Sequence, residues 1–272
     1  MPDWIAAILL GIIEGVTEFL PVSSTGHLVL AEQWLTQHQR EALFGELFNV
    51  VIQSGAVLAV LLVFSKRVRE MAHDWRVPAT RDYTLKLAAA FLITAIGGLA
   101  VKKLGWKLPT TAAPVAWATL IGGVLFLLVE AWLRGRTMRE VITWPAAVTI
   151  GVAQLGAGVF PGASRSGTTI LIALMLGVAR PAATEFSFLL GIPTLMAAGA
   201  YQILSSFRHG EAGEVNWALV AIGTAVSAIS AFIVVKWLLR FVQSHTFVGF
   251  GWYRIVLGAA ILLWGVKRGM GH

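Results

Sequence analysis

The sequence predicts an all-α polytopic membrane protein, because the chain is unusually apolar, contains long apolar runs and breaks them at two polar stretches. Of its 272 residues, 57% are hydrophobic and only 13% are charged, and the mean hydropathy is +0.76. Soluble domains carry about 25% charged residues, so this chain is too apolar for a fully hydrated surface. The polar stretches are EGVTEFLPVSSTGH at 14–27 and PGASRSGTT at 161–169. We expect them to meet and to line one polar site inside the membrane.

The composition limits which metals, lipids and macromolecules this chain can bind. Cysteine is absent, so disulfides and thiolate metal sites are excluded. The net charge of +7, with a pI near 10.1, is typical of basic cytoplasmic loops and contact with anionic lipid. No basic run is long enough to indicate a nucleic-acid partner.

The first element is a broken helix at 4–35. Glu14 and Glu18 are four residues apart, which places both carboxylates on one helical face. Pro21 ends the helix, residues 23–26 form a turn, and a short helix begins near His27. A broken helix cannot face lipid, because its free backbone groups need polar partners. We therefore predict a re-entrant helix pair.

The later apolar runs have the length of membrane-spanning helices. In the first half we expect spans at 44–64, 87–104 and 113–133; in the second half, a re-entrant pair at 145–178 precedes spans at 184–204, 217–240 and 252–268. The segment 65–86 is predicted to be a loop. It carries six Lys or Arg residues, which favours a cytoplasmic position.

The order of elements indicates an internal repeat within one membrane domain. Residues 1–143 and 144–272 each hold a re-entrant pair followed by three spans, and Pro21 and Pro161 both precede a Ser/Thr/Gly break. An odd number of spans gives the halves opposite orientations, which makes the repeat inverted. The two re-entrant pairs would then enter from opposite sides of the membrane.

The polar stretches suit an anion. Hydroxyl groups and free backbone N–H groups at two helix starts would bind a phosphate group, and the helix dipole strengthens this binding. Arg165 adds a planar fork for two phosphate oxygens. His27 is a candidate proton-transfer group or nucleophile, and Ser24 is a candidate nucleophile that His27 is close enough in sequence to activate.

Two carboxylates beside a phosphate repel it unless one is protonated or a cation bridges them. Glu14 and Glu18 are therefore candidate ligands of a divalent cation, Mg²⁺ or Ca²⁺, which binds through carboxylates and substrate phosphates. Charged residues inside a membrane are costly, which favours a functional role for both glutamates, His27 and Arg165.

Other polar residues have structural interpretations. Glu130 is expected to pair with Arg134 one turn further on, Glu185 is a candidate helix cap, and Gln53 is either a packing residue or part of the site wall. For three threonines we favour a structural role as hydrogen-bonding contacts between helices: Thr17, Thr168 and Thr169.

Together the two stretches, supported by ATEFSFLL at 183–190, resemble the undecaprenyl-diphosphate phosphatase family, the membrane phosphatases linked to bacitracin resistance. The resemblance covers nearly the whole chain. It implies hydrolysis of undecaprenyl diphosphate to undecaprenyl phosphate, which recycles the lipid carrier for peptidoglycan. It also implies a bacterial inner-membrane protein whose active site is reached from the periplasm. Undecaprenyl diphosphate and membrane lipid are the expected partners, and a homodimer is the oligomer we consider.

By this resemblance, Glu14 and Glu18 would hold the cation or shuttle protons, and Arg165 would stabilise charge on the transferred phosphoryl group. Ser24, His27 or water would attack the terminal phosphorus. The remaining motif residues would complete the phosphate cradle: Ser23, Thr25, Gly26, Ser164, Ser166, Gly167 and Thr168.

A transporter is the main alternative, because inverted repeats with broken helices are typical of secondary transporters. The same site would then bind a prenyl phosphate and move it between leaflets. Ser24 and His27 distinguish the two hypotheses, since a carrier needs no nucleophile. An intramembrane serine hydrolase is less favoured, because it leaves Arg165 and the two glutamates unexplained.

Overall fold

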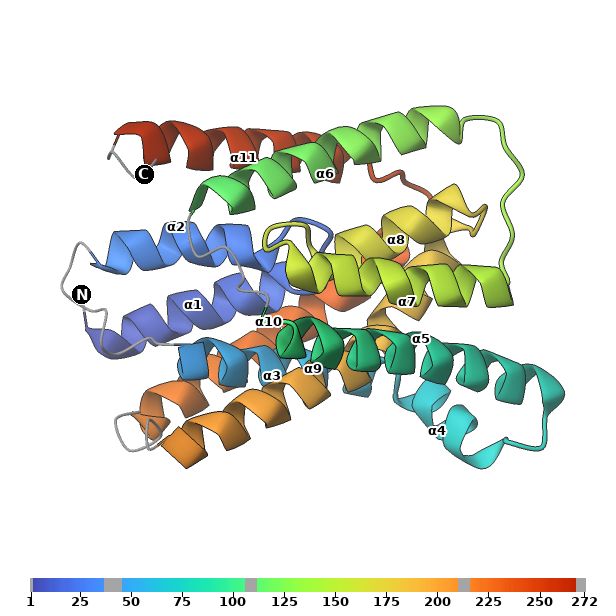
Figure 1. Cartoon of the computed structure of the whole chain (residues 1–272), viewed down its shortest axis with the longest axis horizontal. Coiled ribbons are helices and arrows are strands. Elements are labelled where there is room, and N and C mark those ends of the chain that lie inside the picture. Colours follow the sequence, from blue (N-terminus) through green and yellow to red (C-terminus); the bar gives the residue numbers. More distant parts are fainter. Residues whose placement is uncertain (1, 37–45, 106–111, 210–215, 268–272) are drawn as a thin grey trace.

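The computed structural model describes residues 2–36, 46–105, 112–209 and 216–267 (Figure 1). This part of the chain forms eleven α-helices and no strand beyond an isolated bridge between Arg139 and Val178, which confirms the all-α prediction. The helices are α1 Asp3–Thr17, α2 Ser24–Thr36, α3 Glu46–Val63, α4 Ser65–His73, α5 Pro78–Lys103, α6 Ala112–Trp132, α7 Trp144–Val159, α8 Arg165–Met175, α9 Arg180–His209, α10 Trp217–Phe241 and α11 Val248–Lys267.

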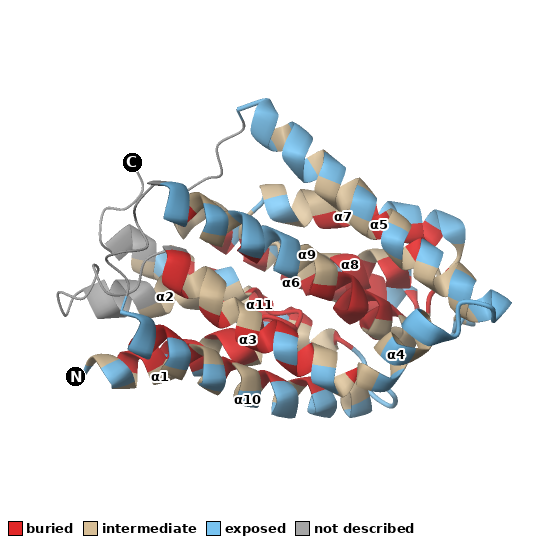
Figure 2. Ribbon diagram, turned by 90° about the horizontal axis from the view of Figure 1, so that it is seen from below, coloured by how far each residue is buried: buried red, intermediate tan, exposed pale blue. Residues whose placement is uncertain are grey.

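The described residues include four helices that are long and apolar enough to cross a membrane: α5, α6, α9 and α10. The count rises to five if α3 and α4, which meet at a bend of 70°, form one span. The sequence predicted six; the expected span at 252–268 corresponds to α11, which within the described residues is a shorter apolar helix. Outward-facing side chains such as Leu62, Ile96 and Leu263 are about two-thirds exposed, whereas the buried residues gather inside the bundle (Figure 2). Lipid would cover such apolar outer faces, so the chain is a multi-pass membrane protein.

Two helical hairpins replace full spans, as the sequence predicted. Helix α1 has 15 residues and reaches about 22 Å, short of the roughly 30 Å of a bilayer core. The chain turns back at 18–23 into α2, and it turns back again at 160–164 between α7 and α8. The hairpins come from opposite ends of the molecule, and their turns meet near its centre (Figure 1).

The boundaries differ from the prediction by a few residues in several helices, and two differences change the description of an element. Helix α2 begins at Ser24, three residues before His27, because Ser23 caps it. The segment 65–86 is mostly helical rather than a loop, since α4 occupies Ser65–His73 and α5 begins at Pro78. Its charges pair at helical spacing, with Lys66 Nζ 4.0 Å and Arg67 Nη1 3.5 Å from the Glu70 carboxylate, and proline is well suited to a first helical turn.

The predicted Glu130–Arg134 pair is wrong. Glu130 is buried and receives two hydrogen bonds from Arg180, of which the one from Nε is 2.9 Å long. It also accepts the backbone N–H of Phe247 at 2.8 Å. Arg134 lies on the exposed turn that follows α6, whereas Glu130 faces the interior. Glu130 therefore joins α6, α9 and the segment before α11.

Helix packing connects the two halves of the chain. Helix α1 packs along α10, α7 along α5, and α6 along α11, so each re-entrant first helix lies against a helix of the other half. Glycines allow this close approach: a Cβ on Gly11 would lie 2.5 Å from the carbonyl oxygen of Gly223. The opposite orientation of the two halves in a membrane stays a prediction, as does their boundary at residue 143.

Candidate active site

Two serines in an unusual backbone conformation begin the helices at the site. Ser23 has φ of 74° and Ser164 has φ of 67°, and they are the only non-glycine residues with positive φ in the described ranges. Each hydroxyl oxygen accepts a backbone N–H three residues on, from Gly26 at 3.2 Å and from Gly167 at 3.1 Å. Such strained conformations are uncommon and concentrate at functional sites. The first turns of α2 and α8 thus have the same capping geometry.

The two turns touch, as the sequence analysis expected. The Ser166 hydroxyl donates to the carbonyl oxygen of Leu20 at 3.0 Å and lies 3.4 Å from that of Glu18. Ser166 is buried, so this bond is shielded from water. It joins residues that are 146 positions apart in the sequence.

Three chemically different side chains converge beside this contact. The Ser24 hydroxyl donates to Glu18 Oε2 at 2.8 Å, and Arg165 Nη2 lies 3.7 Å from Glu18 Oε1. Arg165 also donates through Nη1 to the carbonyl of Ser187 at 3.2 Å. Gly191 leaves room for the guanidinium, because a Cβ there would lie 2.8 Å from Arg165 Cζ. The cluster therefore combines a hydroxyl, its carboxylate acceptor and a fixed cation.

Some buried polar atoms of this cluster have no hydrogen-bond partner among the described residues. They are Arg165 Nε, Arg165 Nη2 and Glu14 Oε2. The 3.7 Å separation of Arg165 from Glu18 is an ion pair but is too long for a hydrogen bond. A buried polar group left unpaired costs about 1–3 kcal/mol. Unpaired donors on Arg165 suit a site that an anionic ligand completes.

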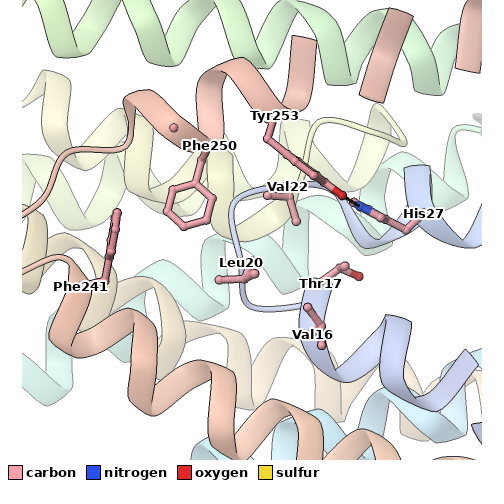
Figure 3. Close-up of a pocket in the computed structure, with 9 residues that line it drawn as sticks. Val16, Thr17, Leu20, Val22, His27, Phe241, Phe250 and Tyr253 are labelled. Atoms are coloured by element: carbon pink, nitrogen blue, oxygen red, sulfur yellow. Dashed lines mark hydrogen bonds between the residues drawn. The ribbon is translucent and has the colours of Figure 1, made fainter. Parts of the chain in front are cut away.

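Both ring nitrogens of His27 have hydrogen-bond partners other than Ser24. Its Nδ1 lies 2.8 Å from the carbonyl oxygen of Ser23, and its Nε2 lies 2.6 Å from the hydroxyl of Tyr253 (Figure 3). It lines an apolar pocket of about 390 Å³ with Val16, Thr17, Leu20, Val22, Phe241, Gly249, Phe250 and Tyr253. Ser24 has Glu18, not His27, as its hydrogen-bond acceptor. The expected activation of Ser24 by His27 is therefore not the arrangement that the structure shows.

A separate, larger cavity of about 960 Å³ gives access to the charged cluster. Motif residues that line it are Glu18, Ser24, Thr25, Pro161, Gly162, Ser164 and Arg165. Gln53 also lines this cavity, so of its two interpretations, packing residue or part of the site wall, the structure favours the second. The cavity extends to Lys102, whose side chain is exposed and contacts the Tyr201 hydroxyl.

The remaining motif residues shape the turns. Thr168 Oγ1 lies 3.4 Å from the carbonyl of Ala163, and Ser164 and Ser166 have their hydroxyl oxygens 3.2 Å apart. Thr17 and Thr169 donate to backbone carbonyls of their own helices, and Thr169 also bonds to the Ser187 hydroxyl on α9 at 2.6 Å.

Sequence reasoning missed a polar group inside this cavity. Gln154 on α7 donates to Thr94 Oγ1 at 3.0 Å and to Thr194 Oγ1 at 3.1 Å, so it joins α5, α7 and α9. A signal was present, since Gln154 interrupts an apolar run and polar residues at membrane depth are functional candidates.

The glutamates fit a hard divalent cation. Glu14 is buried next to Glu18, interacts with the Gln53 side chain, and keeps Oε2 unpaired. No cluster of three His, Cys, Asp or Glu residues exists in the described ranges, so the donor set comprises two carboxylates and an amide. Mg²⁺ in particular keeps several waters and is commonly held by one or two carboxylates together with substrate phosphates.

Comparison with known proteins identifies the relationship. The family model described as "Bacitracin resistance protein BacA" matches residues 7–260. This chain belongs to the BacA family. A Rhizobium etli protein named undecaprenyl-diphosphatase is 51% identical over 261 residues, 96% of each chain. A protein of the same name from Xanthomonas axonopodis pv. citri is 50% identical over 265 residues, 97% of this chain and 98% of its own. The family named from the two motifs is thus confirmed, and this BacA-family chain matches its relatives almost end to end.

Proposed function

We propose that this chain hydrolyses undecaprenyl diphosphate to undecaprenyl phosphate and inorganic phosphate, and so recycles the lipid carrier for peptidoglycan synthesis. The observation that carries the proposal is the cluster of Ser24, Glu18 and Arg165 at a large cavity between two helix starts. Close relatives named undecaprenyl-diphosphatase support the choice of substrate.

In the proposed reaction, the terminal phosphate binds to Arg165 and to the free N–H groups of α2 and α8. Ser24 Oγ attacks the terminal phosphorus while its proton passes to Glu18, which already accepts its hydrogen bond. A bond forms between Ser24 and phosphorus, and the bond from phosphorus to the bridging oxygen breaks. Undecaprenyl phosphate leaves, and Arg165 stabilises the charge on the transferred group.

Water completes the cycle. It attacks the phosphorus of the Ser24 phosphate ester, the bond from phosphorus to Oγ breaks, and inorganic phosphate leaves while Ser24 regains its proton. Glu18 is the adjacent group that gives and takes this proton. We propose that Glu14, Glu18 and Gln53 hold a Mg²⁺ or Ca²⁺ ion, which when bound offsets the negative charge of the phosphates.

His27 has a positioning role in this proposal. It hydrogen-bonds to the Ser23 carbonyl and to the Tyr253 hydroxyl, and it therefore ties the first turn of α2 to α11. We also propose that the protein lies in the bacterial inner membrane with the cavity open to the periplasm. Membrane lipid is then its second partner, and a homodimer stays a prediction.

The test is phosphate release from a polyprenyl diphosphate by the purified protein in detergent, comparing the wild type with Ser24→Ala, His27→Ala and Tyr253→Phe. We expect Ser24→Ala to abolish release. Tyr253→Phe keeps the ring and loses one hydrogen bond, so we expect it to lower the rate of phosphate release by only about tenfold.

Ser24→Ala with at least half of the wild-type turnover would contradict the serine mechanism and favour direct attack by water. A folded wild-type protein that releases no phosphate but exchanges polyprenyl phosphate between liposome leaflets would favour the transporter.

A further inference from the structure

Helix α11 carries a buried cation that the proposed reaction does not use. Arg254 is fully buried and is the largest such side chain among the described residues. All of its hydrogen bonds go to backbone carbonyl oxygens. An arginine buried at this depth needs a structural or electrostatic reason, because burying a charge is costly.

One guanidinium joins the turns of both re-entrant hairpins. Arg254 Nη1 donates to the carbonyl of Pro21 at 3.2 Å. Its Nη2 donates to the carbonyls of Gly162 at 3.3 Å and Ala163 at 3.0 Å. These acceptors lie one or two residues before the helix caps Ser23 and Ser164. The separation of the two phosphate-binding helix starts therefore depends on this side chain.

The same guanidinium is anchored to α6. Its Nε lies 3.2 Å from the carbonyl of Thr119, and Nη2 lies 3.3 Å from that of Ala118. Helix α6 also leaves the space that the guanidinium fills, since a Cβ on Gly122 would lie 2.8 Å from Arg254 Cζ. The turns are thus held against a long helix of the bundle and not only against each other.

Among the described residues, no acidic side chain pairs with Arg254. Arg165 and Arg180 each pair with a glutamate, whereas no carboxylate within the described ranges lies within ion-pair distance of Arg254. Five neutral carbonyls satisfy its donors without cancelling its charge. A positive charge therefore remains behind both turns, where it favours an anion on their other side.

We propose that Arg254 is a positioning residue that holds the two turns at the separation a diphosphate needs and adds positive potential behind them. The inference rests on the proposed function. Because Arg254 is fully buried, it acts through the turns and not by touching the substrate.

Two substitutions separate geometry from charge. Arg254→Lys keeps the charge, but its donors share one nitrogen and cannot reach both turns and α6. Arg254→Gln removes the charge as well. We expect Arg254→Lys to lower kcat about 100-fold while it keeps most of the affinity for inorganic pyrophosphate. Arg254→Gln should lose that affinity too, by about tenfold or more, measured by thermal shift with pyrophosphate as the probe.

A third variant tests the geometry with the arginine intact. The Cβ of Gly122→Ala would lie 2.2 Å from Arg254 Nη2, so the guanidinium must shift. We expect Gly122→Ala to lower kcat in the same direction as Arg254→Lys. Gly156→Ala on α7 is the matched control, because a Cβ there meets no atom within 4 Å, and its turnover should match the wild type.

The outcomes are separable. If the Arg254 variants fail to fold, the kcat of Gly122→Ala tests the positioning role. Wild-type kcat and pyrophosphate affinity in Gly122→Ala and in every folded Arg254 variant would overturn the positioning role. A wild type that binds pyrophosphate but releases no phosphate would overturn the proposed function instead, and pyrophosphate affinity alone would then test Arg254.

Discussion

At the scale of single residues, each side chain of the proposed site has a different chemical role, and few other residue types could replace it. The Ser24 hydroxyl donates to the Glu18 carboxylate at 2.8 Å, which is the acceptor that the proposed reaction uses. The Arg165 guanidinium is held by the Ser187 carbonyl and by the ion pair with Glu18, while its Nε and Nη2 have no hydrogen-bond partner among the described residues. Preorganised donors of this kind stabilise developing charge better than mobile ones.

Arg165→Lys tests the importance of the planar fork. Lysine keeps the charge but offers donors from one nitrogen, so bidentate contact with phosphate is lost. We expect kcat/KM for phosphate release to fall by about 100-fold to 1,000-fold. Arg134→Lys on the exposed turn after α6 is the control and should leave turnover unchanged. Near-normal turnover in Arg165→Lys would contradict a role for Arg165 in phosphate binding.

The proposed cation gives a second residue-scale prediction. A strong chelator should abolish phosphate release, and added Mg²⁺ or Ca²⁺ should restore it. Glu14→Gln should raise the metal concentration required for half-maximal activity by about 10-fold to 100-fold, because one carboxylate ligand is lost. Turnover that is indifferent to the chelator would leave Glu14 and Glu18 as acid and base groups only.

The buried pair of Glu130 and Arg180 concerns stability. Glu130→Gln should lower the free energy of unfolding by about 2–3 kcal/mol, because Arg180 keeps its charge and loses its partner. The measurement is thermal or denaturant unfolding in detergent. Lys66→Gln is the control: the Lys66 side chain is 89% exposed and its contact with Glu70 is 4.0 Å long, so the change should stay below about 0.5 kcal/mol. Equal losses in both variants would contradict a structural role for Glu130.

At the scale of elements, close backbone contact sets the position of the re-entrant helices. Apolar burial does little to drive helices together inside lipid, so small residues and dense packing do this work. Gly11 and Gly15 of α1 face the backbone of α10 at Gly223 and Ser227. Since α1 also carries Glu14 and leads into the turn at 18–23, its packing determines where the carboxylates lie.

Gly15→Ala should therefore affect both stability and activity. The added Cβ would lie 2.9 Å from Ser230 Cβ and nearer still to the Ser227 carbonyl, which forces α1 away from α10. We expect a lower melting temperature and a kcat about 100-fold below that of the wild type, because the glutamates move with α1. An unchanged kcat in a folded Gly15→Ala protein would show that the site does not depend on this contact.

At the scale of the whole molecule, orientation in the membrane follows from the distribution of basic residues. The positive-inside rule predicts that the segment 65–86 is cytoplasmic, and Lys103 at the other end of α5 would then face the periplasm. Since the chain has no cysteine, single introduced cysteines report orientation without background.

Two exposed positions at the opposite ends test this topology. We expect a membrane-impermeant maleimide to label Lys103→Cys in right-side-out vesicles, and to label Arg69→Cys only after the membrane is permeabilised. The reverse pattern would place the cavity on the cytoplasmic side and contradict access from the periplasm.

The sequence by itself determined the class of the protein, the two broken hairpins and the candidate residues of the proposed site. The physical reason is the high cost of polar groups in lipid, which makes Glu14, Glu18, His27 and Arg165 stand out against an apolar background. Helix boundaries were less accurate where charges occurred at helical spacing, as in α4, since charge alone favoured a loop.

Only the tertiary structure decided which of these groups meet. Ser24 faces Glu18 and His27 faces Tyr253, which is 226 residues further on, and Glu130 pairs with Arg180 in place of its neighbour Arg134. Arg254 shows the same limit, because its acceptors come from both turns and from α6. These contacts depend on how each helix is rotated and on which helices are neighbours. Helix rotation and helix neighbours both follow from packing across the whole bundle, so the spacing of residues along one segment does not predict them.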